Sequence, residues 1–231
     1  MLESLVLGAG FTGSRFLASE ENSIGTSHVE GGDCLYFDLA VRSSWGNLPT
    51  CPKKVFITFK MLDLSLVEDF YRDYLCEAEQ IVVLGSAAVY RVDFSGQEIT
   101  ECSAVDFKKH ARALCEDFLE SRGAVILQSS LIWGYERSFE KWLRSGRIKN
   151  GLKLVNLIHV DDIVKLVQLC FAQNLRSERL LLSDGQVLAW QDLADLFSLS
   201  LASEEPGLES KVVSHKKLLG FFPDFEFMKA Y

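Results

Sequence analysis

The chain has 231 residues and a mass of 26.0 kDa, the size of one ordinary domain with room for a small additional lobe. Hydrophobic residues make up 48% and charged residues 24%, a balance that is typical of a globular protein with a sizeable core and excludes disorder as the main state. The formal net charge of -8 repels phosphate backbones, so we expect no nucleic-acid partner.

The amino terminus and the cysteines indicate the compartment. Glu3 stands where a secretory signal would carry a basic residue, and no apolar run reaches the ~18 residues needed to cross a bilayer. The six cysteines are scattered without a Cys-x-x-Cys pair, which is typical of reduced thiols, and the four histidines are equally dispersed. We therefore expect a cytoplasmic protein with no membrane partner and no metal site.

Short apolar runs alternate with longer helical patterns from the amino terminus onward. Strands are predicted at 5–7, 24–29, 35–37, 55–59, 81–84 and 125–127, and helices at 12–19, 64–79 and 105–120. This alternation is typical of a parallel sheet that helices cover on both faces. The predicted fold class is therefore α/β, a doubly wound Rossmann sheet with a small C-terminal α/β lobe.

The pattern changes after Gly134. A charged amphipathic stretch spans 137–149, and shorter strands and helices alternate after it. Residues 203–207 combine polar residues with proline and glycine and predict a loop. We therefore expect a Rossmann core over 1–134, while 135–231 supply the remaining core elements and a small substrate lobe, interleaved.

A glycine motif follows the first predicted strand and precedes the first predicted helix. In Gly-x-Gly-x-x-Gly, the first glycine permits a tight turn, the second lets the backbone approach a diphosphate, and the third lets the helix pack closely on the strand. The helix amino terminus adds N–H groups and a partial positive charge. A glycine-rich turn without a ligand is the alternative. The predicted dinucleotide-binding residues are Gly8, Gly10, Phe11, Thr12 and Gly13.

The type of cofactor depends on the residue at the end of the second strand, where an acidic side chain would bind the adenosine ribose hydroxyls. His28 stands here instead, and because it does not repel a 2′-phosphate the sequence favours NADP(H) over NAD(H). Glu30 and Asp33 are the acidic counter-candidates, and a solvated loop histidine is the alternative for His28. Asp38, at the end of the next strand, could reach the adenine edge.

Several segments together resemble one family. The residues 8–13, 84–90, 131–134 and 158–162 occur in the order and spacing of the extended short-chain dehydrogenase/reductases, the sugar-nucleotide epimerase and dehydratase type. Residues 183–185 and 215–221 resemble the closing segments of that family, so the resemblance covers almost the whole chain. It implies a nicotinamide-dependent protein that acts on a small or sugar-nucleotide-like hydroxyl or carbonyl substrate and, by analogy alone, forms a homodimer.

The catalytic residues of that family are only partly present. A Ser or Thr at the place of Ser86 hydrogen-bonds the reacting group there, and a Tyr-x-x-x-Lys on the next helix transfers the proton. The tyrosine is absent here, because alignment on Glu116 puts Lys108 and Arg112 at the two positions, one helical turn apart. Neither cation is an ordinary acid or base at pH 7. The candidate catalytic residues are Ser86, Lys108 and Arg112.

Three interpretations of this difference stay open. In the first, a buried Lys108 with a lowered pKa, or His110, takes over the proton transfer while Ser86 orients the substrate. In the second, the chain is a catalytically degenerate NADP(H)-binding regulatory or interaction module. In the third, Lys108 and Arg112 hold an anionic group such as a phosphate for lyase or isomerase chemistry. A solvated helix face is the structural alternative for the two cations, and a plain turn serine for Ser86.

His159 stands beside two aspartates, which invites a catalytic interpretation. The arrangement better suits the start of a helix over 163–173, with Asp161 or Asp162 accepting backbone N–H bonds as the N-cap residue. We therefore expect a structural role for this segment.

Overall fold

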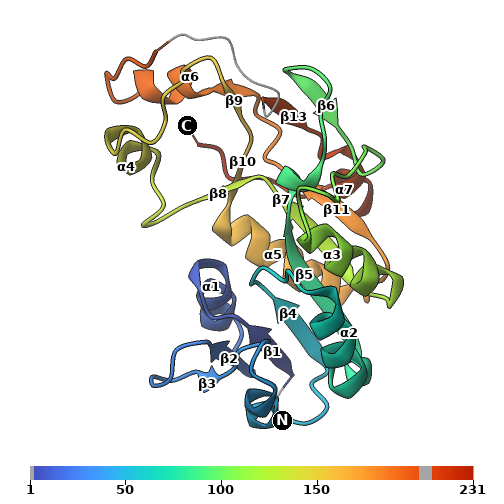
Figure 1. The fold of residues 1–231 in the computed structure, drawn as a ribbon. Helices are drawn as coiled ribbons and strands as arrows, with labels where there is room; N and C mark the ends of the chain where they lie inside the picture. Colours follow the sequence, from blue (N-terminus) through green and yellow to red (C-terminus); the bar gives the residue numbers. More distant parts are fainter. Residues whose placement is uncertain (1–2, 203–209, 231) are drawn as a thin grey trace. The chain divides into compact units, whose positions relative to one another are not determined.

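The computed structural model describes residues 3–202 and 210–230 (Figure 1). The loop predicted at 203–207 lies outside the described residues. The elements of the large sheet and its helices are β1 (Ser4–Leu7), α1 (Phe11–Ser19), β2 (Ser23–Ser27), β3 (Leu35–Tyr36), β4 (Lys54–Ile57), α2 (Leu64–Asp73), β5 (Gln80–Ser86), α3 (Arg112–Ser121), β7 (Val125–Ser129), α5 (Val160–Ala172) and β11 (Arg179–Leu182). Short 3-10 helices lie at η1 (Arg42–Asn47), η2 (Leu75–Glu77) and η3 (Ala87–Val89).

Seven strands form one sheet in the order β11-β7-β5-β4-β1-β2-β3. Strand β1 pairs in parallel with both β2 and β4, so the chain builds outward from β1 in one direction and then restarts beside it in the other. This reversal between β1 and β4 defines a doubly wound sheet, and ligands of such folds bind at the carboxyl ends of the strands next to it. The predicted fold class is confirmed.

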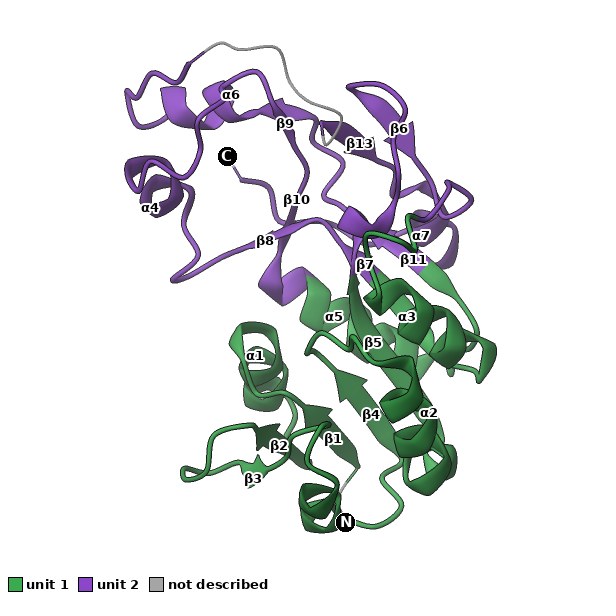
Figure 2. Cartoon of the chain, viewed as in Figure 1, with its two compact units in different colours: residues 1–85, 106–127, 163–179 green, residues 86–105, 128–162, 180–231 purple. Residues whose placement is uncertain are grey.

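The chain forms two compact units that are interleaved along the sequence (Figure 2). The first unit comprises residues 1–85, 106–127 and 163–179. The second comprises residues 86–105, 128–162 and 180–231. The two units are defined by which residues pack together, whereas we placed the predicted boundary at residue 134 from the order of the sequence motifs.

Helices cover both faces of the sheet in the first unit. On one face, Phe16 of α1 packs against Phe56 of β4 and Phe171 of α5, with ring centroids 5.4 and 6.2 Å apart. Ile57, the next residue of β4, belongs instead to a buried cluster with Phe70 of α2. Because successive side chains of a strand point to opposite faces, α1 and α5 cover one face and α2 covers the other. This is the layering that the alternating strand and helix pattern predicted.

Helix α3 begins at Arg112 and not at Val105, where the apolar spacing placed its start. The chain before it forms a turn, in which the Asp106 carboxylate accepts a hydrogen bond from Lys109 N and the Asp106 carbonyl accepts one from His110 N. An aspartate that binds the backbone in this way competes with helix formation. The helical prediction for the residues before Arg112 is therefore wrong.

The second unit consists of short paired strands and helices. Strand β8 (Leu131–Trp133) pairs with β10 (Leu157–His159), β6 (Gln97–Ile99) with β13 (Lys211–Val213), and β9 (Leu154–Val155) with β12 (Leu188–Ala189). The helices are α4 (Phe139–Arg144), α6 (Trp190–Asp195) and α7 (Lys216–Phe221). Phe139, Leu157 and Trp190 share one buried apolar cluster. None of the helices in the part of the chain that the structure describes is long and apolar enough to span a bilayer.

The start of α5 corrects one local prediction. The helix begins at Val160, so both aspartates lie inside its first turn and neither precedes it. His159 Nδ1 accepts the hydrogen bond from Asp161 N, at 3.2 Å, and so takes the place of the N-cap side chain. Asp162 Oδ2 accepts a hydrogen bond from Met228 N at 2.8 Å, which ties the carboxyl-terminal segment to this helix. The predicted N-cap role of Asp161 or Asp162 is therefore wrong, because the capping residue is the histidine.

Candidate functional site

The glycine loop lies in the first unit, between β1 and α1. Gly8 has a φ of +101°, a conformation that side-chain-bearing residues rarely adopt, and it turns the chain out of the sheet. Gly10 is the N-cap residue of α1, whose first turn contains no acidic residue. The first N–H groups of an α-helix have no carbonyl partner in a preceding turn. The amino terminus of α1 therefore offers a ligand hydrogen-bond donors and the positive end of the helix dipole.

The three glycines meet three different surroundings. A Cβ at Gly13 would lie 2.1 Å from the Gly8 carbonyl oxygen, so helix and loop approach too closely for any side chain. A Cβ at Gly8 would lie 2.7 Å from Thr58 Oγ1. At Gly10 nothing lies within 4 Å. The packing of the protein therefore requires the first and third glycines, whereas the second faces open space of the kind that a diphosphate would occupy.

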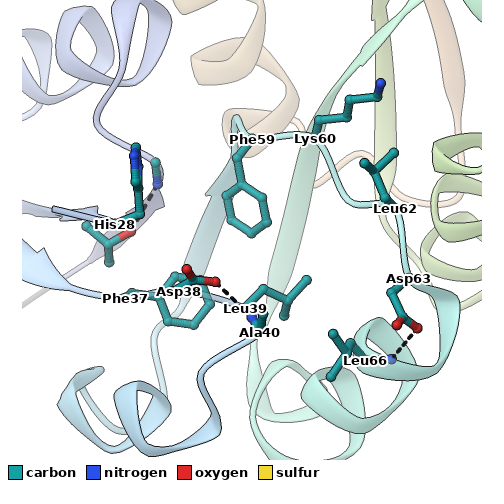
Figure 3. Close-up of a pocket in the computed structure, with 12 residues that line it drawn as sticks. His28, Phe37, Asp38, Leu39, Ala40, Phe59, Lys60, Leu62, Asp63 and Leu66 are labelled. Carbon is teal, nitrogen blue, oxygen red and sulfur yellow. Dashed lines mark hydrogen bonds between the residues drawn. The ribbon is translucent and has the colours of Figure 1, made fainter.

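A cavity of about 390 Å³ opens beside this loop, and all its lining residues belong to the first unit (Figure 3). Gly8, His28 and Asp38, which the sequence proposed for cofactor binding, lie together in its wall. Its wall is formed by Gly8, Thr26, His28, Phe37, Asp38, Leu39, Ala40, Phe59, Lys60, Leu62, Asp63 and Leu66. The wall is mainly apolar with a few polar groups, which is typical of small-molecule sites.

Asp38 and Asp63 are the two carboxylates in the wall of this cavity. The Oδ1 of Asp38 accepts a hydrogen bond from Ala40 N at 2.9 Å, and its backbone N–H donates to Ser44 Oγ at 3.0 Å. Glu30 and Asp33, the acidic counter-candidates, are exposed and absent from the cavity wall. His28 is exposed immediately after β2 and lies in the wall. Asp63 caps helix α2 by accepting from Leu66 N.

Lys60 and Phe59 were missed by the sequence reasoning. They follow β4, the strand next to β1, and Phe59 Cδ1 would lie 3.5 Å from a Cβ at Gly8. Lys60 is exposed at the carboxyl end of β4, and its amine points away from His28 (Figure 3). No sequence motif marks the turn after β4. Phe59 and Lys60 could have been proposed only from their position after a strand that lies next to β1.

Arg112, one of the candidate catalytic residues, is the first residue of α3. Its Nε donates to Glu116 Oε1 at 2.8 Å, and its Nη2 donates to the Leu84 carbonyl oxygen at 3.1 Å. The Arg112 and Glu116 side chains are 14% and 1% exposed. Arg112 thus joins its helix to β5 through the hydrogen bond to Leu84, while its largely buried ion pair with Glu116 lies within α3. Both contacts are structural and require no substrate.

Lys108 lies in the turn before α3 and is exposed to solvent. It is not on the helix that carries Arg112, so the two cations are not one helical turn apart on one face. Lys108 is therefore not the buried lysine that the first interpretation required.

Ser86 belongs to the second unit, where it ends β5 and precedes η3. It is half-buried, and its Oγ accepts a hydrogen bond from Ala88 N at 3.3 Å. Lys211 Nζ donates to the carbonyl oxygens of Ala87 and Tyr90, at 2.8 and 3.0 Å. Among the residues that the structure describes, the serine hydroxyl has no acceptor for its own hydrogen, and Lys211 of β13 fixes the turn that carries it.

No group of three His, Cys, Asp or Glu side chains among residues 3–202 and 210–230 is arranged to hold a metal ion. Among the described residues of the second unit, burial is the main cause of the pKa shifts of Asp184 and His215. Burial raises the pKa of the Asp184 carboxyl above its ordinary value, and burial together with the charges of Lys229 and Lys216 lowers the pKa of His215.

Neither a family model nor a curated protein matches the sequence. Solved structures do match the fold. A functionally unknown conserved protein from Silicibacter pomeroyi matches at 17% identity over 100% of this chain and 95% of that chain, with a TM-score of 0.77. A short-chain dehydrogenase/reductase superfamily protein from Agrobacterium tumefaciens, solved with bound NAD, matches at 14% identity over 99% of this chain and 93% of that chain, with a TM-score of 0.72.

The UDP-glucose 4-epimerase from Thermotoga maritima, solved with UDP-glucose, matches at 15% identity over 99% of this chain and 94% of that chain, with a TM-score of 0.73. The chain has the fold of an extended short-chain dehydrogenase/reductase. The resemblance expected from the motifs is confirmed at the level of the fold. At these identities the comparison with the dehydrogenase/reductases concerns the fold alone, and the activity has to be argued from the residues of this chain.

Proposed function

We propose that the first unit binds a nicotinamide dinucleotide, with its diphosphate at the glycine loop and its adenosine in the adjoining cavity. The observation that carries this proposal is the contrast among the glycines. Gly8 and Gly13 are required by the protein itself, whereas Gly10 borders open space at a helix amino terminus. A glycine with no neighbour to accommodate is explained by a ligand that approaches the backbone.

The residues of the cavity fit the adenosine half of such a cofactor. The apolar wall from Phe37 and Leu39 suits the adenine ring, and the Asp38 carboxylate suits its amino group or a ribose hydroxyl. His28 follows β2 and lies in the cavity wall, and we propose NADP(H) as the preferred form because no carboxylate follows β2 directly. Asp38, which lies in the same wall, supports NAD(H) as the alternative.

We propose that the reaction is an epimerase-, dehydratase- or reductase-like conversion of a hydroxyl or carbonyl group on a small or sugar-nucleotide-like substrate. When bound, the cofactor supplies hydride transfer. Ser86 is proposed to orient the substrate by donating a hydrogen bond from its hydroxyl to the substrate oxygen, since among the described contacts the hydroxyl serves only as the acceptor for Ala88 N. A cytoplasmic location and a homodimer accord with this function.

A second candidate function rests on the contacts of Arg112. Its guanidinium donates to Glu116 and to the Leu84 carbonyl, and Lys108 is exposed in a turn. The guanidinium is thus engaged within the protein, and the lysine does not lie on the same helix. A catalytically degenerate protein that binds the cofactor as a regulatory or interaction module accounts for these contacts without any proton transfer.

Titration of the full chain with NADH and NADPH, followed by nucleotide fluorescence, tests the binding proposal. We expect micromolar affinity for at least one of them, with NADPH tighter. Absence of binding of either at millimolar concentration would refute the site. Among candidate sugar-nucleotide substrates, turnover that Ser86→Ala abolishes without loss of cofactor binding supports the enzyme. Binding with no turnover of any tested substrate supports the module.

A further inference from the structure

Two threonines hold the peptide groups of Gly8 from either side. Thr26, at the end of β2, accepts a hydrogen bond from Gly8 N on its Oγ1 at 3.0 Å, and its carbonyl accepts one from Ala9 N at 2.7 Å. Thr58, just after β4, donates from Oγ1 to the Gly8 carbonyl oxygen at 2.5 Å. Both strands pair with β1, so the loop is held by its two neighbours in the sheet.

The space around Gly8 allows little movement. Thr26 is 1% exposed, and its hydroxyl is fixed in the core of the first unit. The Gly8 carbonyl oxygen lies 2.1 Å from where a Cβ of Gly13 would be, so the same oxygen is in contact with the first turn of α1. A rotation of this peptide would move the carbonyl into the helix or break its bond to Thr58.

These contacts also decide which N–H groups are available to a ligand. The N–H groups of Gly8 and Ala9 are already bound to Thr26, so a diphosphate would meet the backbone that follows, at Gly10 and the start of α1. The direction of that backbone follows from how the Gly8 peptide is held. Thr58 is not part of the cavity wall, so it acts on a ligand in the cavity only through the loop.

We propose that Thr58, together with Thr26, is a positioning residue that holds the glycine loop in its phosphate-binding shape before the ligand arrives. This inference rests on the proposed function, because the loop needs a preset shape only if it binds a diphosphate. A loop that is already ordered avoids the entropy cost of being ordered on binding. The Thr58 hydroxyl therefore contributes to affinity for the phosphates and not for the adenosine.

The variant Thr58→Val removes the hydroxyl and keeps the shape of the side chain, whereas Thr58→Ser keeps the hydroxyl. The probes are ADP, which carries a diphosphate, and adenosine, which carries none. We expect Thr58→Val to weaken ADP binding about tenfold, and adenosine binding and the ADP affinity of Thr58→Ser to stay within about twofold of wild type. Thr50→Val, the same change at an exposed residue, is the matched control and should bind both probes as wild type does.

Isothermal titration of the full chain separates the outcomes. If the wild type binds ADP and Thr58→Val binds it equally well, the positioning role is refuted. If Thr58→Val weakens ADP and adenosine by the same factor, the residue has only a structural role and the proposal is again refuted. If the wild type binds no ADP, the dinucleotide site itself fails. If Thr58→Val does not fold, Thr58→Ala replaces it as the variant that lacks the hydroxyl. A Thr58→Ser variant that binds ADP about tenfold more weakly than wild type would then overturn the proposal, because it keeps the hydroxyl.

Discussion

The glycine loop makes opposite predictions for two neighbouring alanine substitutions. In Gly13→Ala the new Cβ would lie 2.1 Å from the Gly8 carbonyl oxygen, 3.0 Å from Val6 Cγ1 and 3.1 Å from the Gly8 carbonyl carbon. Two of these three atoms are backbone, so no flexible side chain can swing away. The loop or α1 has to shift by roughly 1 Å, and we expect a loss of about 3 kcal/mol in the free energy of unfolding, the upper part of the range for overpacking.

In Gly10→Ala the new Cβ meets nothing within 4 Å, and the backbone φ of −78° is one that alanine adopts freely. The free energy of unfolding should change by less than about 1 kcal/mol, because alanine is a weaker N-cap residue but restricts the unfolded chain. The same methyl group would occupy the space proposed for the diphosphate. We therefore expect ADP and NADPH affinity to fall at least tenfold.

Urea unfolding followed by circular dichroism measures the stability of both variants, and isothermal titration measures binding to Gly10→Ala. Unchanged stability in Gly13→Ala would mean that helix and loop do not approach as described. Wild-type nucleotide affinity in Gly10→Ala would mean that no diphosphate approaches this backbone, and the dinucleotide proposal would then lose its main support.

Three further predictions concern single side chains. Arg112→Met removes the cation that is paired with the buried Glu116 carboxylate, and it should lower the free energy of unfolding in urea by about 3 to 5 kcal/mol. The double variant Arg112→Met with Glu116→Gln should recover part of this loss, and a loss below about 1 kcal/mol in the single variant would contradict the prediction. Burial raises the pKa of the Asp184 carboxyl, so ionisation of this carboxyl destabilises the folded state. The stability of Asp184→Asn relative to wild type should therefore increase as the pH rises from about 4 through the raised pKa. A stability difference that is constant from pH 4 to 8 would refute this. His28→Ala should weaken NADPH several-fold in fluorescence titration and leave NADH unchanged, and an equal effect on both would remove His28 from 2′-phosphate recognition.

The glycine loop could be predicted from the sequence because its constraints are local. A strand that ends at Leu7 and a helix that begins at Phe11 leave only a short turn, and the spacing of Gly8 and Gly13 follows from that turn alone. The same holds for His28 and Asp38, which stand at the ends of consecutive strands of a parallel sheet. Strand order brings them to one cavity. The alternation of strands and helices predicted a doubly wound sheet, but it did not predict the order of the strands.

Lys60 and the start of α3 could not be predicted in this way. Lys60 reaches the cavity because β4 pairs with β1, about fifty positions earlier in the chain, and no local pattern marks that turn. The apolar spacing before α3 was compatible with a helix, but the Asp106 side chain binds the backbone of Lys109 and sets a turn instead. Apolar periodicity does not measure such competition by a polar side chain.

The two parts of the proposed site are under different physical constraints. The nucleotide-binding part consists of backbone that packing determines: Gly8 held by Thr26 and Thr58, and Gly13 against the Gly8 carbonyl. The proton-transfer part depends on side-chain chemistry, and there Arg112 is bound to Glu116 and β5. Arg112 therefore stabilises the fold whether or not the protein catalyses a reaction. Cofactor binding is therefore the part of the proposal that rests on backbone fixed by packing. Turnover has to be tested on Ser86, whose hydroxyl has no acceptor among the described contacts.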